Sequence, residues 1–187
     1  GQALTARVAT LGINPSKREF LDIGGTLLEG PARRLATTKS IGETDLAAAP
    51  RSSVDQVLND CFSYFTKETA YWSWFGRLEP TLRALGASYR DGSGCHLDLV
   101  QWATDPVWRR LELQVKRQLL QSDAKFLEQQ LRNEQLEVLL VNGSGVFNEL
   151  VTAFGRNLII DEVAPIIEGH RQKVRLYRGE LFNRVRF

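Results

Sequence analysis

Short runs of apolar residues predict four β-strands in this chain. They cover residues 8–13, 97–100, 138–141 and 174–177. The third run, within LEVLLVNG, is apolar at several consecutive positions, which is typical of a strand buried on both faces of a sheet. Helical patterns lie between most of the strands, and this alternation favours right-handed crossovers and a largely parallel sheet covered on both faces.

Apolar residues repeat at helical spacing in five segments. The predicted helices cover residues 53–65, 72–85, 106–120, 123–131 and 147–154. Ser52 or Ser53 is expected to cap the first of them, Pro106 to open the third, and Ser122 with Asp123 to cap the fourth. Residues 17–51 are expected to be a loop-rich excursion, and such long excursions are more often functional than idle.

The composition indicates an ordinary globular chain. It has 187 residues, of which 43% are hydrophobic and 25% charged, so we expect one domain over residues 1–187. A membrane-spanning apolar run and a secretory signal pattern are both missing from the sequence. The cysteines, Cys61 and Cys95, are too few for a disulfide framework, which favours a reduced, cytoplasmic location. Two histidines and two distant cysteines do not have metal-ligand spacing, so we expect neither a metal nor a cofactor.

The charge is unevenly distributed along the chain. The net charge is +2, but residues 170–187 hold six basic residues against one acidic residue, which leaves the remainder mildly acidic. This segment predicts contact with an anionic partner on one side of the molecule. The alternative is a solvated edge hairpin whose cations prevent strand-to-strand aggregation. The basic residues that we expect at such a contact are Arg171, Lys173, Arg175 and Arg178.

Unusual residues follow three of the predicted strands. The segments are GINPS after the first strand, HLDLVQWATDP around the second and VNGSGV after the third. Ligands of open parallel sheets bind beyond the carboxyl ends of the strands, so we expect the three segments to form one pocket. The predicted pocket residues in these segments are Gly12, Ile13, Asn14, Pro15, Ser16, Asp98, Asn142, Gly143 and Ser144. VNGSGV is equally compatible with a phosphate-binding turn at a helix N-terminus.

His96 and Asp98 are two residues apart, so they share a face if they lie on a strand. The pair is compatible with catalysis, but a structural pair is the simpler interpretation because no nucleophile accompanies it.

GINPS resembles the first active-site motif of the uracil-DNA glycosylase superfamily, in the Asn-bearing version of the mismatch-specific and thymine-DNA glycosylases. Ser16 stands where glycine is commoner. The resemblance implies a three-layer α/β/α fold in which the motif leaves the first strand. It also implies that Asn14 orients the water that attacks the anomeric carbon, that Phe20 stacks on the flipped base, and that the basic segment binds DNA.

The second motif of that superfamily, His-Pro-Ser or Asn-Pro-Ser after the last strand, is not found in the sequence. Two functions therefore remain open. The first is hydrolysis of the N-glycosidic bond of uracil or a related base in DNA, by a monomer. The second is that of an inactive relative that binds a nucleotide or another small ligand in the same pocket. A third class is an interaction protein that docks a partner through the helix at 106–120.

Overall fold

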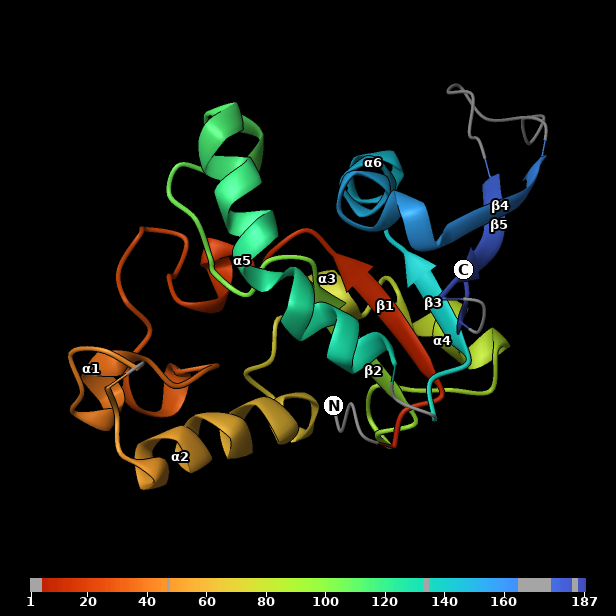
Figure 1. The fold of residues 1–187 in the computed structure, drawn as a ribbon. Coiled ribbons are helices and arrows are strands. Elements are labelled where there is room, and N and C mark those ends of the chain that lie inside the picture. The colour runs from red at the N-terminus through yellow and green to blue at the C-terminus, as the bar shows by residue number, and fades with distance from the viewer. Residues whose placement is uncertain (1–4, 47, 133–134, 165–175, 183–184) are drawn as a thin grey trace.

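The structure is a computed structural model that describes residues 5–46, 48–132, 135–164, 176–182 and 185–187. Its strands form a single sheet in the order β2-β1-β3-β6-β5-β4, with β1 between β2 and β3 (Figure 1). The strand bounds are β1 Val8–Gly12, β2 Gly94–Asp98, β3 Val138–Val141, β4 Leu158–Ala164, β5 Leu176–Leu181 and β6 Val185–Arg186.

The sheet is mostly parallel, as the alternation of strands and helices predicts. β1 runs parallel to β2 and β3, and β3 runs parallel to β6. β5 is antiparallel to both β6 and β4, so the β4 side of the sheet is an antiparallel extension. The expected α/β class with a mostly parallel sheet is therefore confirmed.

The strand predictions were best near the centre of the sheet. The prediction at 138–141 coincides with β3, and the first strand ends at Gly12, one residue early. The second strand starts at Gly94 and stops at Asp98, earlier than predicted at both ends. Residues 174 and 175 of the fourth prediction lie outside the described part, whereas the other two open β5. β4 and β6 were missed, because Asp161 interrupts the apolar run of β4 and β6 has only 2 residues.

The helices are α1 Thr38–Ile41, α2 Arg51–Phe62, α3 Trp72–Phe75, α4 Glu79–Ala84, α5 Leu113–Leu131 and α6 Ser144–Phe154. The prediction of one continuous helix over 72–85 was wrong, because α3 ends at Phe75 with Gly76 as its C-cap, and Pro80 takes up a first-turn position of α4. The helix expected to begin at Pro106 begins at Leu113 instead. None of the helices in the described residues is long and apolar enough to cross a bilayer.

Two expected caps have other roles in the structure. Ser122 and Asp123 lie inside α5, where the Asp123 carboxylate accepts the backbone N–H of Gln101 at 2.6 Å. Ser53 lies inside α2, after an N-cap at Pro50, and its hydroxyl donates to Glu43 at 2.7 Å. Both side chains bond to groups distant in the sequence, and a local pattern carries no sign of such partners.

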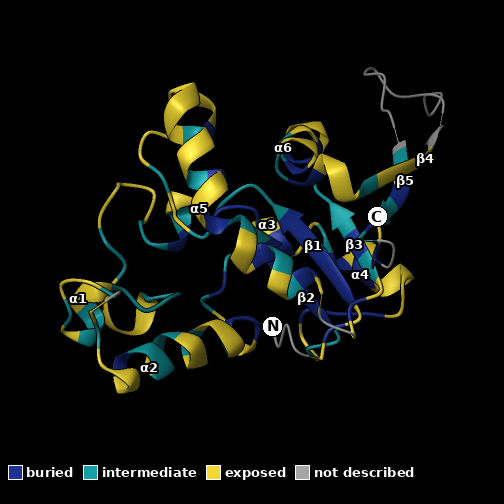
Figure 2. Ribbon diagram, viewed as in Figure 1, coloured by how far each residue is buried: buried dark blue, intermediate teal, exposed yellow. Residues whose placement is uncertain are grey.

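Successive residues of β1 are buried in two different hydrophobic clusters. Ala9 belongs to a cluster that includes Leu127 of α5 and Leu150 of α6. Val8 belongs to a second cluster with Phe75 of α3 and with Leu82 of α4. β1 is accordingly the dark, buried centre of Figure 2, while α1 and α2 are largely exposed.

Candidate functional site

The three predicted strand exits meet at one edge of the sheet. Beyond the regular ladder, the N–H of Leu99 donates to the carbonyl of Gly12 at 3.1 Å, which joins the ends of β2 and β1. The N–H of Asn142 donates to the carbonyl of Leu11 at 3.1 Å and joins β3 to β1 from the other side. The parallel register thus brings GINPS between the other two segments, as the sequence predicts.

The amide of Asn14 is held by the loop that follows β2. Its Nδ2 atom donates to the carbonyl of Trp102 at 3.0 Å and lies 3.3 Å from Oγ1 of Thr104. A carbonyl oxygen only accepts, so the Trp102 contact determines which way the amide is turned. The acceptor oxygen Oδ1 therefore faces away from the Trp102 carbonyl.

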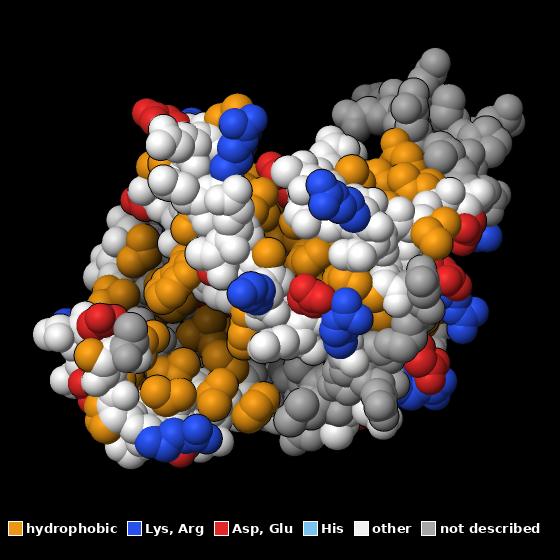
Figure 3. Space-filling view, viewed as in Figure 1, with side chains coloured by type: hydrophobic (Ala, Val, Ile, Leu, Met, Phe, Trp, Pro, Cys, Tyr) orange, Lys and Arg blue, Asp and Glu red, His pale blue; other side chains and the backbone are white. Residues whose placement is uncertain are grey.

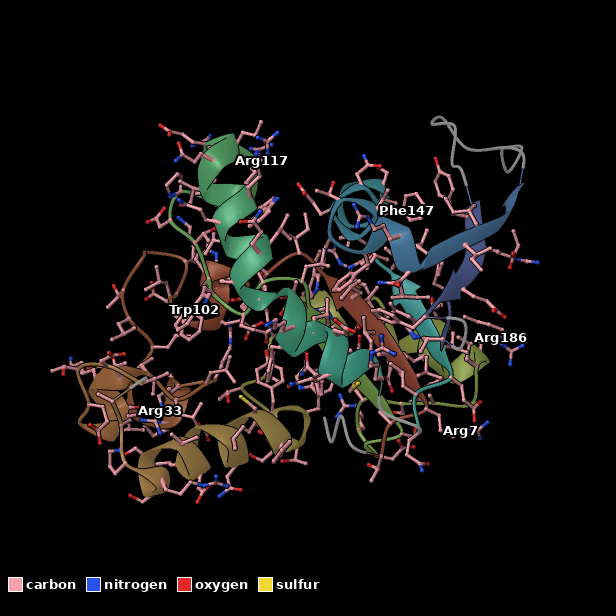
Figure 4. All side chains as sticks on the ribbon, viewed as in Figure 1. Arg7, Arg33, Trp102, Arg117, Phe147 and Arg186 are labelled. Atoms are coloured by element: carbon pink, nitrogen blue, oxygen red, sulfur yellow. The ribbon has the colours of Figure 1, made fainter. Side chains whose placement is uncertain are left out.

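A hollow lined by hydrophobic side chains lies between the α1–α2 segment and the rest of the molecule (Figure 3). The side chain of Trp102 lies beside α5 on the side of this segment, and 55% of it is exposed (Figure 4). The half-buried Asn14 is bonded to the backbone of this same residue. A polar side chain is thus held next to exposed apolar surface, as in many ligand sites.

Gly12 is required by the close approach of β2. A Cβ atom at Gly12 would lie 2.6 Å from Oδ1 of Asp98 and 3.1 Å from Nε2 of His96. The two β2 side chains therefore occupy the space that any larger residue would need. The expectation that they share a face is confirmed, since Nε2 and Oδ1 are 3.5 Å apart.

Asp98 carries an unsatisfied buried oxygen. Its Oδ1 has no hydrogen-bond partner among the described residues, and the 3.5 Å separation from His96 is too long for a good bond. Buried carboxylate oxygens are normally paired, so Oδ1 of Asp98 is an unusual feature of this edge.

Thr10 connects His96 to the interior of the protein. Its hydroxyl lies 2.5 Å from the hydroxyl of Tyr89 and 2.7 Å from Nδ1 of His96. Burial raises the pKa of Tyr89, so the phenol stays neutral. Neither Thr10 nor Tyr89 stands out in the sequence as a site residue, because the first lies in an apolar run and the second in a polar turn.

Glu19 is a second buried carboxylate near this edge. It accepts the Tyr64 hydroxyl at 2.5 Å, and that hydroxyl in turn accepts the backbone N–H of Tyr71 at 2.8 Å. Burial raises the pKa of Glu19, while the Tyr64 bond and the charges of Arg34 and His96 act in the opposite direction. Glu19 was not predicted as a site residue, because the sequence around it does not distinguish it from the charged residues Lys17 and Arg18.

The remaining residues of the first segment have mainly structural contacts. Ser16 is exposed, and its hydroxyl caps the short helix Lys17–Glu19 by accepting the N–H of Arg18 at 3.2 Å. Pro15 and Phe20 are half-buried. The backbone carbonyl of Phe20 accepts an N–H from Leu28 at 2.8 Å, and a stacking role for its ring remains a prediction.

The segment after β3 turns sharply into α6. Gly143 has φ +94°, a conformation that favours glycine, and α6 begins at Ser144. Asn142 is half-buried, whereas Gly143 and Ser144 are exposed. A Cβ atom at Gly145 would lie 4.0 Å from Cδ1 of Ile13, so the first turn of α6 borders GINPS.

Of the four predicted DNA-binding residues, the structure describes Arg178 alone. Arg171, Lys173 and Arg175 fall outside the described residues. Arg178 is exposed on β5, and two strands, β6 and β3, lie between β5 and β1. The structure therefore does not bring Arg178 to the end of β1.

Within the described residues, no group of three or more His, Cys, Asp and Glu side chains is arranged to hold a metal ion. Comparisons with protein-family models, with curated proteins and with solved structures found no match for this chain. The geometry at the carboxyl ends of β1, β2 and β3 is therefore the basis for a function.

Proposed function

We propose that this chain is a DNA glycosylase-like protein that hydrolyses the N-glycosidic bond of uracil or of a related damaged or mismatched base. The observation that carries the proposal is the fixed orientation of the Asn14 side-chain amide. Its Nδ2 is engaged by Trp102 and Thr104 at the end of a central parallel strand, which leaves Oδ1 as a fixed acceptor for a water.

The reaction needs a positioned water more than a strong base. The water oxygen bonds to the anomeric carbon as the bond from that carbon to the base nitrogen breaks. The bonding electron pair leaves with the base, and the proton released by the water neutralises it. An Asn side chain orients the water for this attack without itself taking the proton.

The departing base also needs donors for its developing negative charge. Asp98 does not suit this role, because its side chain has no N–H group to donate. The backbone N–H groups at the start of α6 are better suited, because the first N–H groups of a helix have no acceptor within the helix and favour negative charge, and because this turn borders Ile13.

Further support comes from the placement of the motif. In the superfamily that GINPS resembles, the motif leaves the first strand of a three-layer α/β/α sheet. Here it leaves β1, whose successive residues enter two clusters that contain different helices. We therefore propose the same three-layer arrangement for this chain, with DNA as the partner.

A strand-cleavage assay tests the proposal. Duplex and single-stranded oligonucleotides that carry uracil, hypoxanthine or a mismatched thymine are incubated with the protein, and alkali then cuts at abasic sites. Asn14→Ala should lower excision by about 100-fold or more, which is typical of losing one positioned group. Asn59→Ala, the same change at an exposed residue of α2, should leave it unchanged.

Excision that persists in Asn14→Ala would refute the role of Asn14. If the folded wild-type chain cleaves none of these substrates, the alternative is favoured, an inactive relative that binds a nucleotide or another small ligand beside Asn14. Calorimetric titration with mononucleotides would then measure that binding.

A further inference from the structure

The buried face of α5 includes a carboxylate. Asp123 lies among Leu120, Leu127 and Leu131, the three other buried residues of this helix. Burying a carboxylate is costly unless hydrogen bonds replace the lost water, and a leucine at this position would carry no such cost. The partners of Asp123 therefore indicate what this residue does.

Both oxygens of the Asp123 side chain accept a hydrogen bond. Oδ2 accepts the backbone N–H of Gln101 at 2.6 Å, and Oδ1 accepts the hydroxyl of Ser122 at 2.6 Å. The Gln101 side chain donates in turn to the carbonyl of Asp98, the last residue of β2, at 2.8 Å. Asp123 thus attaches the loop that leaves β2 to the buried face of α5.

The same loop is bonded to GINPS on each side of Gln101. The N–H of Val100 donates to the carbonyl of Ile13 at 2.8 Å. The carbonyl of Trp102 accepts Nδ2 of Asn14 at 3.0 Å. Gln101 lies between these two contacts, so its position determines where the Trp102 carbonyl meets the Asn14 amide.

We propose that Asp123 is a positioning residue for the hydrolytic water, because it fixes the loop whose Trp102 carbonyl orients Asn14. This inference rests on the proposed function, in which Oδ1 of Asn14 holds that water. Without Asp123, the N–H of Gln101 loses its buried acceptor, and the loop must move to find another. The amide of Asn14 is then free to turn, and a displacement of about 1 Å is enough to slow such a reaction by about 100-fold.

Two variants of Asp123 distinguish the acceptor from the charge. Asp123→Leu removes the acceptor and fills its place, whereas Asp123→Asn keeps an oxygen for Gln101 and can donate its N–H to the Ser122 hydroxyl. Uracil excision is followed in single turnovers with protein in excess, so that slow variants are measurable. Asp123→Leu should lower the maximal rate constant by about 10-fold to 100-fold, and the protein concentration that gives half of this rate should change by less than about twofold. Asp123→Asn should retain most of the wild-type rate.

A combination with Asn14→Ala separates positioning from general damage to the site. If Asp123 acts through Asn14, Asp123→Leu should change the rate constant of the Asn14→Ala protein by less than about twofold. Circular dichroism verifies that each variant is folded. If Asp123→Leu does not fold, Asp123→Ser takes its place, because the shorter side chain no longer reaches Gln101.

Glu79→Leu is the matched control. Glu79 is a buried carboxylate of α4 that accepts the backbone N–H of Tyr89 at 3.1 Å, on the loop that enters β2 instead of the loop that leaves it. The folded Glu79→Leu protein should excise uracil at the wild-type rate.

Equal rate constants for Asp123→Leu and the wild type would overturn the positioning role and leave the glycosylase activity standing. A loss by the same factor with and without the Asn14 side chain would overturn it too, as would an Asp123→Asn protein as slow as Asp123→Leu. Wild-type protein that excises none of the bases would overturn the proposed function, and the role of Asp123 with it.

Discussion

Gly12→Ala provides the sharpest test of how the candidate site is built. The added Cβ would lie 2.6 Å from Oδ1 of Asp98, and contacts under 3.0 Å are essentially never seen for a real Cβ. Asp98 has little freedom to retreat, because it is paired with Gly12 across the β1–β2 ladder and its side chain is only 13% exposed. His96, at 3.1 Å, blocks a second direction.

The expected cost follows from overpacking. An extra carbon forced into a well-packed site destabilises a protein by about 1–3 kcal/mol. For a chain of this size, each kcal/mol lowers the melting temperature by roughly 2–4 °C, so we expect a fall of roughly 2–12 °C. Thermal unfolding followed by circular dichroism measures it, and excision activity should fall as well because Asn14 is only two residues away.

Gly155→Ala is the matched control. A Cβ atom at Gly155 would meet Cγ1 of Val151 at 3.8 Å, which is an ordinary contact. Gly155 has helical dihedral angles, so the change should be neutral or should stabilise the fold by up to about 1 kcal/mol.

A double variant separates the clash from other effects. Asp98→Ala removes the oxygen that the new Cβ meets, so Gly12→Ala should cost less in that background, with a coupling energy of about 1 kcal/mol. A Gly12→Ala protein that melts with or above the wild type would refute this reasoning. An equal cost with and without the Asp98 side chain would refute it as well.

Three further outcomes follow from the same part of the molecule. Burial raises the pKa of Glu19 above its ordinary 4.5, so the folded state binds the proton more tightly than the unfolded state and stability falls as pH rises through this range. The free energy of unfolding in urea should be measured for the wild type and for Glu19→Gln at about pH 4 and about pH 7. The variant should gain stability relative to the wild type at the higher pH, and an equal difference between the two proteins at both pH values would contradict this expectation. Thr10→Val removes a hydroxyl that bonds to the buried Tyr89 and the half-buried His96, and it should lower the free energy of unfolding by about 1–3 kcal/mol, whereas a loss near zero would mean that water replaces the hydroxyl. A thiol reagent should modify the exposed Cys61 in the folded protein, and Cys95, whose pKa burial raises to about 12, only after unfolding. Labelling of both thiols at equal rates in the native state would be inconsistent with this fold.

Regular patterns of apolar residues in the sequence were sufficient to predict the two strands at the centre of the sheet, β1 and β3. Residues 138–141 form the predicted strand, and the apolar run before GINPS forms β1. A buried strand needs apolar residues at consecutive positions, and that requirement is local, so the sequence records it. The meeting of GINPS with two other strand exits also followed, because a parallel sheet brings its carboxyl ends to one edge.

Features that leave no regular pattern of apolar and polar residues could not be predicted from the sequence. β6 has only 2 residues and exists because it pairs with β3 on one side and β5 on the other. Asp123 was expected at a helix end but lies inside α5, where its carboxylate serves the backbone of Gln101. In both cases one partner, β3 for β6 and Gln101 for Asp123, is far away in the sequence.

The strand that precedes Asn14, and the edge of the sheet at which Asn14 lies, could thus be predicted from the apolar pattern. The groups that surround Asn14 could be identified from the folded chain alone. Register placed His96 against Thr10 and Asp98 against Gly12, and chain folding buried Glu19 beneath Tyr64. The spacing of apolar residues follows from the local periodicity of a strand or helix, so it can be read from the sequence. The hydrogen-bond partner of a buried polar group depends on which segments the fold brings together.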